Sequence, residues 1–164
     1  MIGEWWVVFP RCGKPTSAFR LSTFALLLGG AAATTHAIFL ARNGAGPEEI
    51  RAEIQARYAY NMSRTVDEIR RNYRFNETCQ ETVPEALVCA LEAKDFEDAI
   101  RNAISIGGDS DTVAAIAGGL AEAMFGIPDE LAREGLAKLP TDMKAVLETL
   151  YAKRGNAKNN NLFK

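Results

Sequence analysis

Residues 103–128, AISIGGDSDTVAAIAGGLAEAMFGIP, decide how the rest of this 164-residue chain is interpreted. A glycine pair, Gly107 and Gly108, stands directly before two acidic residues, Asp109 and Asp111, and a segment of small apolar residues follows them. The glycines predict a turn that ends one helix, and the small apolar residues predict a second helix that begins beside the acidic pair. The stretch therefore places two like charges at the start of a segment that has the composition of a protein core.

The helix after the turn has a stripe of small residues on one face. Ala114, Ala117, Gly118 and Ala121 recur at helical spacing, and Gly119 adds a second glycine. A glycine inside a helix costs about 1 kcal/mol relative to alanine. The glycines therefore indicate close packing against another backbone, and we expect this helix to be central in the domain.

Two explanations of the acidic pair remain open from the residues alone. Asp109 is well placed as an N-cap, and Asp111 lies in the first turn, where the helix dipole favours negative charge. Two neighbouring carboxylates repel each other, however, unless a proton or a cation neutralises them. With the hydroxyl of Thr112, they form a set of hard oxygen donors that suits Mg²⁺ or Mn²⁺ rather than zinc.

Capping signals predict further helices along the chain. Thr65 with Glu68, and Thr82 with Glu85, have the spacing of a capping box. Asp95 predicts the N-cap of a helix whose apolar residues fall on a single face. That face consists of Phe96, Ala99, Ile100, Ala103 and Ile104. No alternating strand pattern and no internal repeat is found, so the fold class is all-α.

Composition restricts the class of protein. Apolar residues make up 48% and charged residues 24%, which is the balance of a globular domain. A net charge of −2 offers no basic surface for nucleic acid and no polybasic patch for a membrane. The three cysteines, Cys12, Cys79 and Cys89, have no close spacing, which argues against a disulfide framework or a zinc site. We therefore expect a reducing compartment and a cytoplasmic location.

The N-terminal region has two interpretations. Arg11, Lys14 and Arg20 precede an apolar run over residues 21–41, a pattern similar to a signal peptide or a single membrane span. Glycines, threonines and the only histidine, His36, interrupt this run, which favours a buried helix instead. We expect the buried helix, with His36 as a packing residue rather than a ligand.

The full motif, NAISIGGDSDTVAAIAGGLAEAMFGIP, resembles the C-terminal signature of the ADP-ribosylglycohydrolase family. Three upstream segments, AIFLARNG, IRRNYRF and TCQETVPEALVCALEAKDFEDAIRNAIS, resemble the same family in the same order. The resemblance runs from about residue 30 to about residue 134. It implies an orthogonal multi-helix bundle of that family's type over residues 30–154, after an unmatched leader (1–29) and before a polar tail (155–164).

The resemblance also implies a binuclear Mg²⁺ centre and hydrolysis of the glycosidic bond that joins ADP-ribose to a protein side chain or a small molecule. The matching metal ligands are Asp109, Asp111 and Thr112. The residues expected beside the substrate are Gly107, Gly108, Ser110 and Tyr73; Tyr73 could stack on an adenine or could simply pack. No residue is assigned as catalytic.

The sequence departs from the family pattern in its N-terminal part. The family has a second set of metal ligands in a Thr-Asp-Asp string, and this chain contains no Asp-Asp dipeptide; its nearest match, Thr141-Asp142, begins the last predicted helix. The bundle and its metal site are therefore expected to be incomplete. Two functions remain open: a Mg²⁺-dependent hydrolase that acts on an ADP-ribosylated protein or small molecule, and a non-catalytic helical fragment that self-associates or pairs with a missing N-terminal half.

Overall fold

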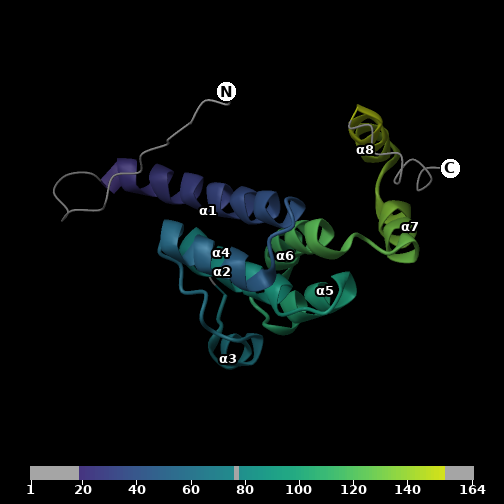
Figure 1. Ribbon diagram of the computed structural model, residues 1–164. Helices are drawn as coiled ribbons and strands as arrows, with labels where there is room; N and C mark the ends of the chain where they lie inside the picture. The colour runs from purple at the N-terminus through teal and green to yellow at the C-terminus, as the bar shows by residue number, and fades with distance from the viewer. Residues whose placement is uncertain (1–18, 76–77, 154–164) are drawn as a thin grey trace.

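Helices make up the whole regular structure of the computed structural model, which describes residues 19–75 and 78–153 (Figure 1). No strand occurs in these two ranges, so the all-α prediction is confirmed. The helices in chain order are α1 (Phe19–Arg42), α2 (Pro47–Tyr58), α3 (Val66–Asn72), α4 (Cys79–Leu91), α5 (Phe96–Ser105), α6 (Ser110–Phe125), α7 (Asp129–Lys138) and α8 (Thr141–Lys153).

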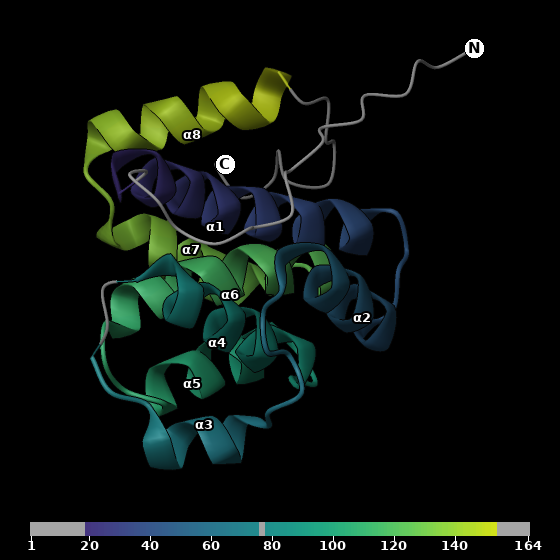
Figure 2. The same cartoon turned by 90° about the vertical axis from the view of Figure 1, so that its left-hand side faces the viewer.

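Helix α6 occupies the centre of the bundle and packs against α1, α4 and α5 (Figure 2). A Cβ atom built on Gly118 would lie 3.1 Å from Cδ1 of Ile100 on α5. One built on Gly119 would lie 3.5 Å from Cδ1 of Ile38 on α1. The glycine pair, in the middle of α6, thus packs against side chains of α5 and α1, tightly at Gly118 and at ordinary contact distance at Gly119.

Helix α4 is the second core element, and it is buried continuously from residue 82 to residue 91. It packs against α1, α5 and α6, and its first residue, Cys79, lies against Gly30 of α1. Cys89 is fully enclosed, and this burial raises the pKa of its thiol to about 12. Because α4 has no solvent-facing side over this length, any polar residue in it must find a partner inside the protein.

Two of the predicted helix starts are confirmed. The Thr65 hydroxyl accepts the backbone N–H of Glu68, and the Glu68 carboxylate accepts the N–H of Thr65, which completes a capping box. The Asp95 carboxylate accepts the N–H of Asp98 at 2.8 Å and caps α5.

Two details of the sequence interpretation are wrong. Thr82 and Glu85 do not form a capping box, because α4 begins at Cys79 and both residues are buried inside the helix. On α5, Ile104 is 56% exposed, while Ile106, just after the helix, enters the core. The buried face of α5 is therefore narrower than the helical spacing indicates, and it centres on Ala99 and Ala103.

Helices α7 and α8 extend away from the bundle beyond the end of α6 (Figure 1). No residue of α7 is buried. On α8, three large apolar side chains are at least half exposed: Met143, Val146 and Leu150.

The N-terminal helix α1 packs on α2, α4 and α6. No helix of the described residues is long and apolar enough to cross a membrane. His36 is half-buried with its ring edge-on to Tyr58, at 5.9 Å between ring centroids, and burial lowers its pKa. The domain boundaries expected after residues 29 and 154 stay predictions, and residues 1–18 and 155–164 lie outside the described part of the chain.

Candidate functional site

The turn between α5 and α6 is built on two glycines in the left-handed conformation. Gly107 has φ 80° and Gly108 has φ 69°, values that residues with a side chain rarely adopt. Asp109 follows as the N-cap of α6, and its carbonyl accepts the N–H of Val113 at 3.0 Å. Its carboxyl group makes no capping hydrogen bond. Asp109 therefore occupies the N-cap position of α6, but its side chain does not cap the helix.

Asp109 and Asp111 stand one residue apart where α6 begins, and the interaction of Asp111 with the Asp109 side chain is the largest cause that holds the pKa of Asp111 below its usual value. The backbone N–H groups of Thr112 and Asp111 act in the same direction. A cation bound by both carboxylates would relieve their mutual repulsion. The structure thus brings together the two acidic groups that the sequence singles out.

The surroundings of this pair are open to solvent. Asp109 and Ser110 are half-buried, whereas Asp111 and Thr112 are exposed. Asp111 and Thr112 therefore lie at the surface of the domain.

Tyr73, at the C-terminal end of α3, lies directly against the glycine turn. A Cβ atom on Gly108 would come within 2.4 Å of Cε1 of the Tyr73 ring. Burial raises the pKa of Tyr73, and the charges of Glu85, Asp109 and Glu81 add to this shift. The Tyr73 hydroxyl is buried and has no hydrogen-bond partner among the described residues. The tyrosine is therefore within electrostatic reach of Asp109 on one side and of the acidic residues of α4 on the other.

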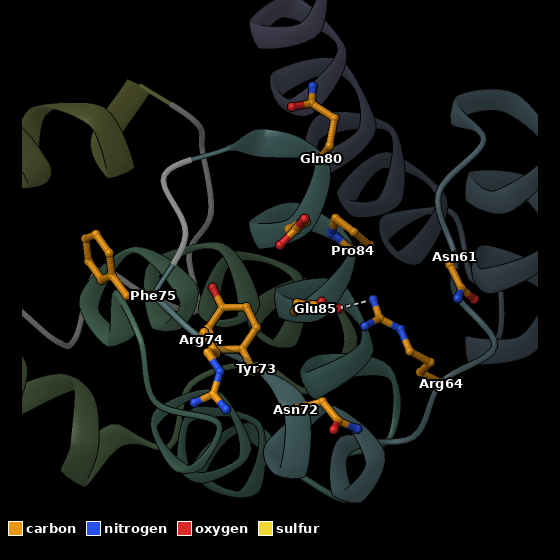
Figure 3. A pocket seen from close by; sticks show the side chains of 10 residues that line it. Asn61, Arg64, Asn72, Tyr73, Arg74, Phe75, Gln80, Pro84 and Glu85 are labelled. Atoms are coloured by element: carbon orange, nitrogen blue, oxygen red, sulfur yellow. Dashed lines mark hydrogen bonds and ion pairs between the residues drawn. The ribbon is translucent and has the colours of Figure 1, made fainter.

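Tyr73 also lines a pocket of about 570 Å³ (Figure 3). Its volume falls in the range of small-molecule sites. Charged, amide and aromatic side chains from the segment after α2, the end of α3 and the first half of α4 face it. They are Asn61, Arg64, Asn72, Tyr73, Arg74, Phe75, Gln80, Glu81, Pro84 and Glu85.

A buried ion pair forms one wall of this pocket. Nη2 of Arg64 lies 2.6 Å from Oε2 of Glu85, and the two side chains are 36% and 4% exposed, respectively (Figure 3). Burial raises the pKa of Glu85, and the charge and hydrogen bond of Arg64 oppose that shift. Sequence reasoning missed this carboxylate by placing it in a capping box. The signal that could have revealed it is its position inside the apolar run of residues 82–91, where a carboxylate must be buried and paired.

The sequence-predicted site residues are thus divided between two neighbouring places. Tyr73 lines the pocket, whereas Gly107, Gly108 and the acidic segment do not. The contact between Tyr73 and Gly108 joins the two places.

The oxygen donors at residues 109–112 fit a magnesium ion in kind but not in number. Mg²⁺ requires six oxygen ligands in near-octahedral geometry. Asp109, Asp111 and Thr112 supply two carboxylates and a hydroxyl, and within residues 19–75 and 78–153 no group of three or more acidic, histidine or cysteine side chains could hold a metal. Asp142 lies on α8, away from this turn (Figure 1).

Comparison with known families gives one match. The family model described as ADP-ribosylglycohydrolase matches residues 10–160, which covers most of the chain, including α6, the glycine turn and the pocket. No curated protein and no solved structure matches the chain.

Proposed function

The chain belongs to the ADP-ribosylglycohydrolase family, and on this premise we propose that it is a hydrolase that cleaves the glycosidic bond between ADP-ribose and a protein side chain or small molecule. The observation that supports this proposal most is the position of Tyr73, which lines the pocket and also contacts Gly108 of the acidic turn. A ligand in the pocket would then lie beside the paired carboxyl groups. We further propose a cytoplasmic location, consistent with the free thiols of Cys79 and Cys89.

We assign the ADP-ribosyl group to the pocket because of the chemistry of its walls. Tyr73 and Phe75 offer aromatic surface, and the Phe75 side chain is 64% exposed, so its face is open to an adenine. Arg74 is exposed beside it and supplies a guanidinium for a diphosphate. Asn61 and Asn72 add amide groups that can bind ribose hydroxyls.

We assign Asp109, Asp111 and Thr112 to part of a Mg²⁺ site. A bound Mg²⁺ ion supplies charge neutralisation and orients water and substrate hydroxyls. We expect weak binding, because three donors leave much of the coordination shell to water or to ligands from elsewhere.

The test combines calorimetry with a hydrolysis assay on ADP-ribosylated arginine and serine peptides, with and without Mg²⁺. Asp109→Asn should lose both Mg²⁺ binding and hydrolysis, because an amide cannot replace an anionic ligand. Asp95→Asn is the matched control, since Asp95 also caps a helix and asparagine is an equally good N-cap. Unchanged Mg²⁺ affinity in Asp109→Asn would overturn the assignment.

A second function is favoured by the exposed apolar side chains of α8, Met143, Val146 and Leu150. These could belong to a non-catalytic helical module that self-associates, since exposed apolar patches mark association surfaces. Light scattering separates the two proposals. An associating chain that hydrolyses none of the substrates with Mg²⁺ or Mn²⁺ would favour the module, and an active monomer would exclude it.

A further inference from the structure

Two side chains of the pocket carry a buried polar atom that has no hydrogen-bond partner. Among the residues that the structure describes, three side-chain atoms are of this kind: Nδ1 of His36, Nε of Arg64 and the hydroxyl oxygen of Tyr73. Arg64 and Tyr73 both line the pocket (Figure 3), whereas His36 does not. Buried polar groups are normally hydrogen-bonded, so each unpartnered group requires a physical explanation.

The Tyr73 hydroxyl is the less compensated of these two groups. Arg64 still pairs through Nη2 with Glu85 at 2.6 Å, so only part of its guanidinium lacks a partner. The hydroxyl, in contrast, is the only polar group of the Tyr73 side chain. Burial raises the pKa of Tyr73, so the hydroxyl stays protonated and remains a donor at neutral pH. An enclosed donor without an acceptor destabilises the ligand-free protein, and a ligand that brings an acceptor removes this cost.

The charges around the hydroxyl indicate which kind of acceptor fits it. Besides burial, the charges of Glu85, Asp109 and Glu81 each raise the pKa of Tyr73. The hydroxyl therefore lies in a negative potential, which disfavours an anionic group such as a phosphate beside it. An uncharged acceptor, such as a ribose oxygen or an adenine nitrogen, avoids this repulsion.

We propose that Tyr73 is a specificity-determining residue, whose hydroxyl donates a hydrogen bond to an uncharged acceptor of the ADP-ribosyl group in the pocket. This inference rests on the proposed function, which places that group in the pocket. Because the hydroxyl is enclosed in the ligand-free protein, the ring has to turn toward the pocket as the ligand binds. Gly108 leaves the ring free of a side chain at this point, since a Cβ atom there would lie only 2.4 Å from Cε1 of Tyr73.

The test compares Tyr73→Phe with Tyr58→Phe in the full chain and measures the affinity for free ADP-ribose by calorimetry. Tyr58 is the matched control, because its hydroxyl is part-buried but donates to the carbonyl of Ala32 at 3.2 Å, and the residue does not line the pocket. Tyr73→Phe should weaken ADP-ribose binding about tenfold, since it removes one hydrogen bond to the ligand. Tyr58→Phe should leave the affinity unchanged. Wild-type affinity in Tyr73→Phe would overturn the proposal.

The melting temperatures of the ligand-free variants separate a ligand-binding hydroxyl from a structural one. Tyr73→Phe should keep or raise the melting temperature, because it removes a buried group that has no partner. Tyr58→Phe should lower it by about 2–4 °C, because it removes a hydrogen bond that the folded protein makes. An equal fall in both variants would show that the Tyr73 hydroxyl already has a partner, such as a water molecule, and would overturn the proposal.

Pyrophosphate tests whether the acceptor is uncharged. Its competition against ADP-ribose should be the same in the wild-type protein and in Tyr73→Phe, and a tenfold weaker competition in the variant would place a phosphate at the hydroxyl and contradict the inference. Failure of the proposed function gives a different result. A wild-type protein that does not bind ADP-ribose would overturn both proposals, whereas one that binds it without hydrolysing the ADP-ribosylated peptides would overturn the hydrolase alone.

Discussion

Replacement of Arg64 by methionine tests the buried ion pair of the pocket most sharply. Methionine retains the unbranched stem and removes the charge, so the carboxylate of Glu85, with a side chain only 4% exposed, loses its partner. Removal of one partner from a buried ion pair typically costs about 3–5 kcal/mol. The lower end applies here, because Arg64 is 36% exposed and its Nε is buried with no hydrogen-bond partner among the described residues.

We therefore expect Arg64→Met to reduce the free energy of unfolding by about 3 kcal/mol at pH 7. For a protein of this length, that corresponds to a fall in melting temperature of roughly 10 °C. Urea denaturation monitored by circular dichroism measures the first quantity, and a thermal melt measures the second. Glu85→Gln is the paired variant. It leaves the half-exposed Arg64 able to contact water, so it should reduce the free energy of unfolding by less than Arg64→Met does.

The pH dependence gives an independent check of the same reasoning. Burial raises the pKa of Glu85, and the loss of Arg64 removes the groups that oppose this shift. A carboxyl group whose pKa is higher in the folded state than in the unfolded state binds more protons in the folded protein at intermediate pH. Its contribution to the free energy of unfolding is therefore present at low pH and is lost as the pH rises. The loss of unfolding free energy in Arg64→Met should therefore become smaller as the pH falls toward about 4, which is near the pKa of glutamate in an unfolded chain. A loss of unfolding free energy in Arg64→Met that does not vary with pH would refute this account. A larger loss at pH 7 in Glu85→Gln than in Arg64→Met would also refute it.

Three further predictions concern the core and the helix ends. Gly119→Ala should raise the free energy of unfolding, measured by urea denaturation, by up to about 1 kcal/mol. Gly118→Ala should raise it less, because a Cβ atom at 118 would lie only 3.1 Å from Cδ1 of Ile100, whereas one at 119 would lie at the ordinary contact distance of 3.5 Å from Cδ1 of Ile38. Cys89 should resist alkylation at pH 8 until the protein unfolds, because burial raises its pKa to about 12; mass spectrometry of the peptides would detect early labelling that contradicts this. Asp95→Ala should reduce the free energy of unfolding by about 1 kcal/mol, because it removes the N-cap of α5, and should lower the melting temperature accordingly. An unchanged melting temperature would show that the cap does not stabilise the protein.

Local sequence signals predicted much of the fold. The caps at Thr65 and Asp95 were predicted correctly because a capping box depends only on residues three positions apart. The glycine pair of α6 correctly indicated close packing. The same local rule failed at Thr82 and Glu85, because α4 continues through both residues and tertiary packing, not capping, decides their environment.

The candidate site was only partly predictable, for a physical reason. The acidic turn is contiguous in sequence, so Asp109 and Asp111 could be singled out from their spacing, which left helix capping and metal binding both open. The pocket is assembled from the segment after α2, the end of α3 and the first half of α4, and no periodicity links these segments. The contact of Tyr73 with Gly108 depends in addition on how α3 packs on α4.

The measurement that tests the central claim most directly is paramagnetic broadening by Mn²⁺ in a two-dimensional ¹H–¹⁵N spectrum of the full chain. If Asp109, Asp111 and Thr112 bind a divalent cation beside Tyr73, the amide signals of residues 107–112 and of Tyr73 should broaden first as Mn²⁺ is added. Signals that stay sharp in this region, while those of an exposed acidic pair such as Glu48 and Glu49 broaden, would contradict the account.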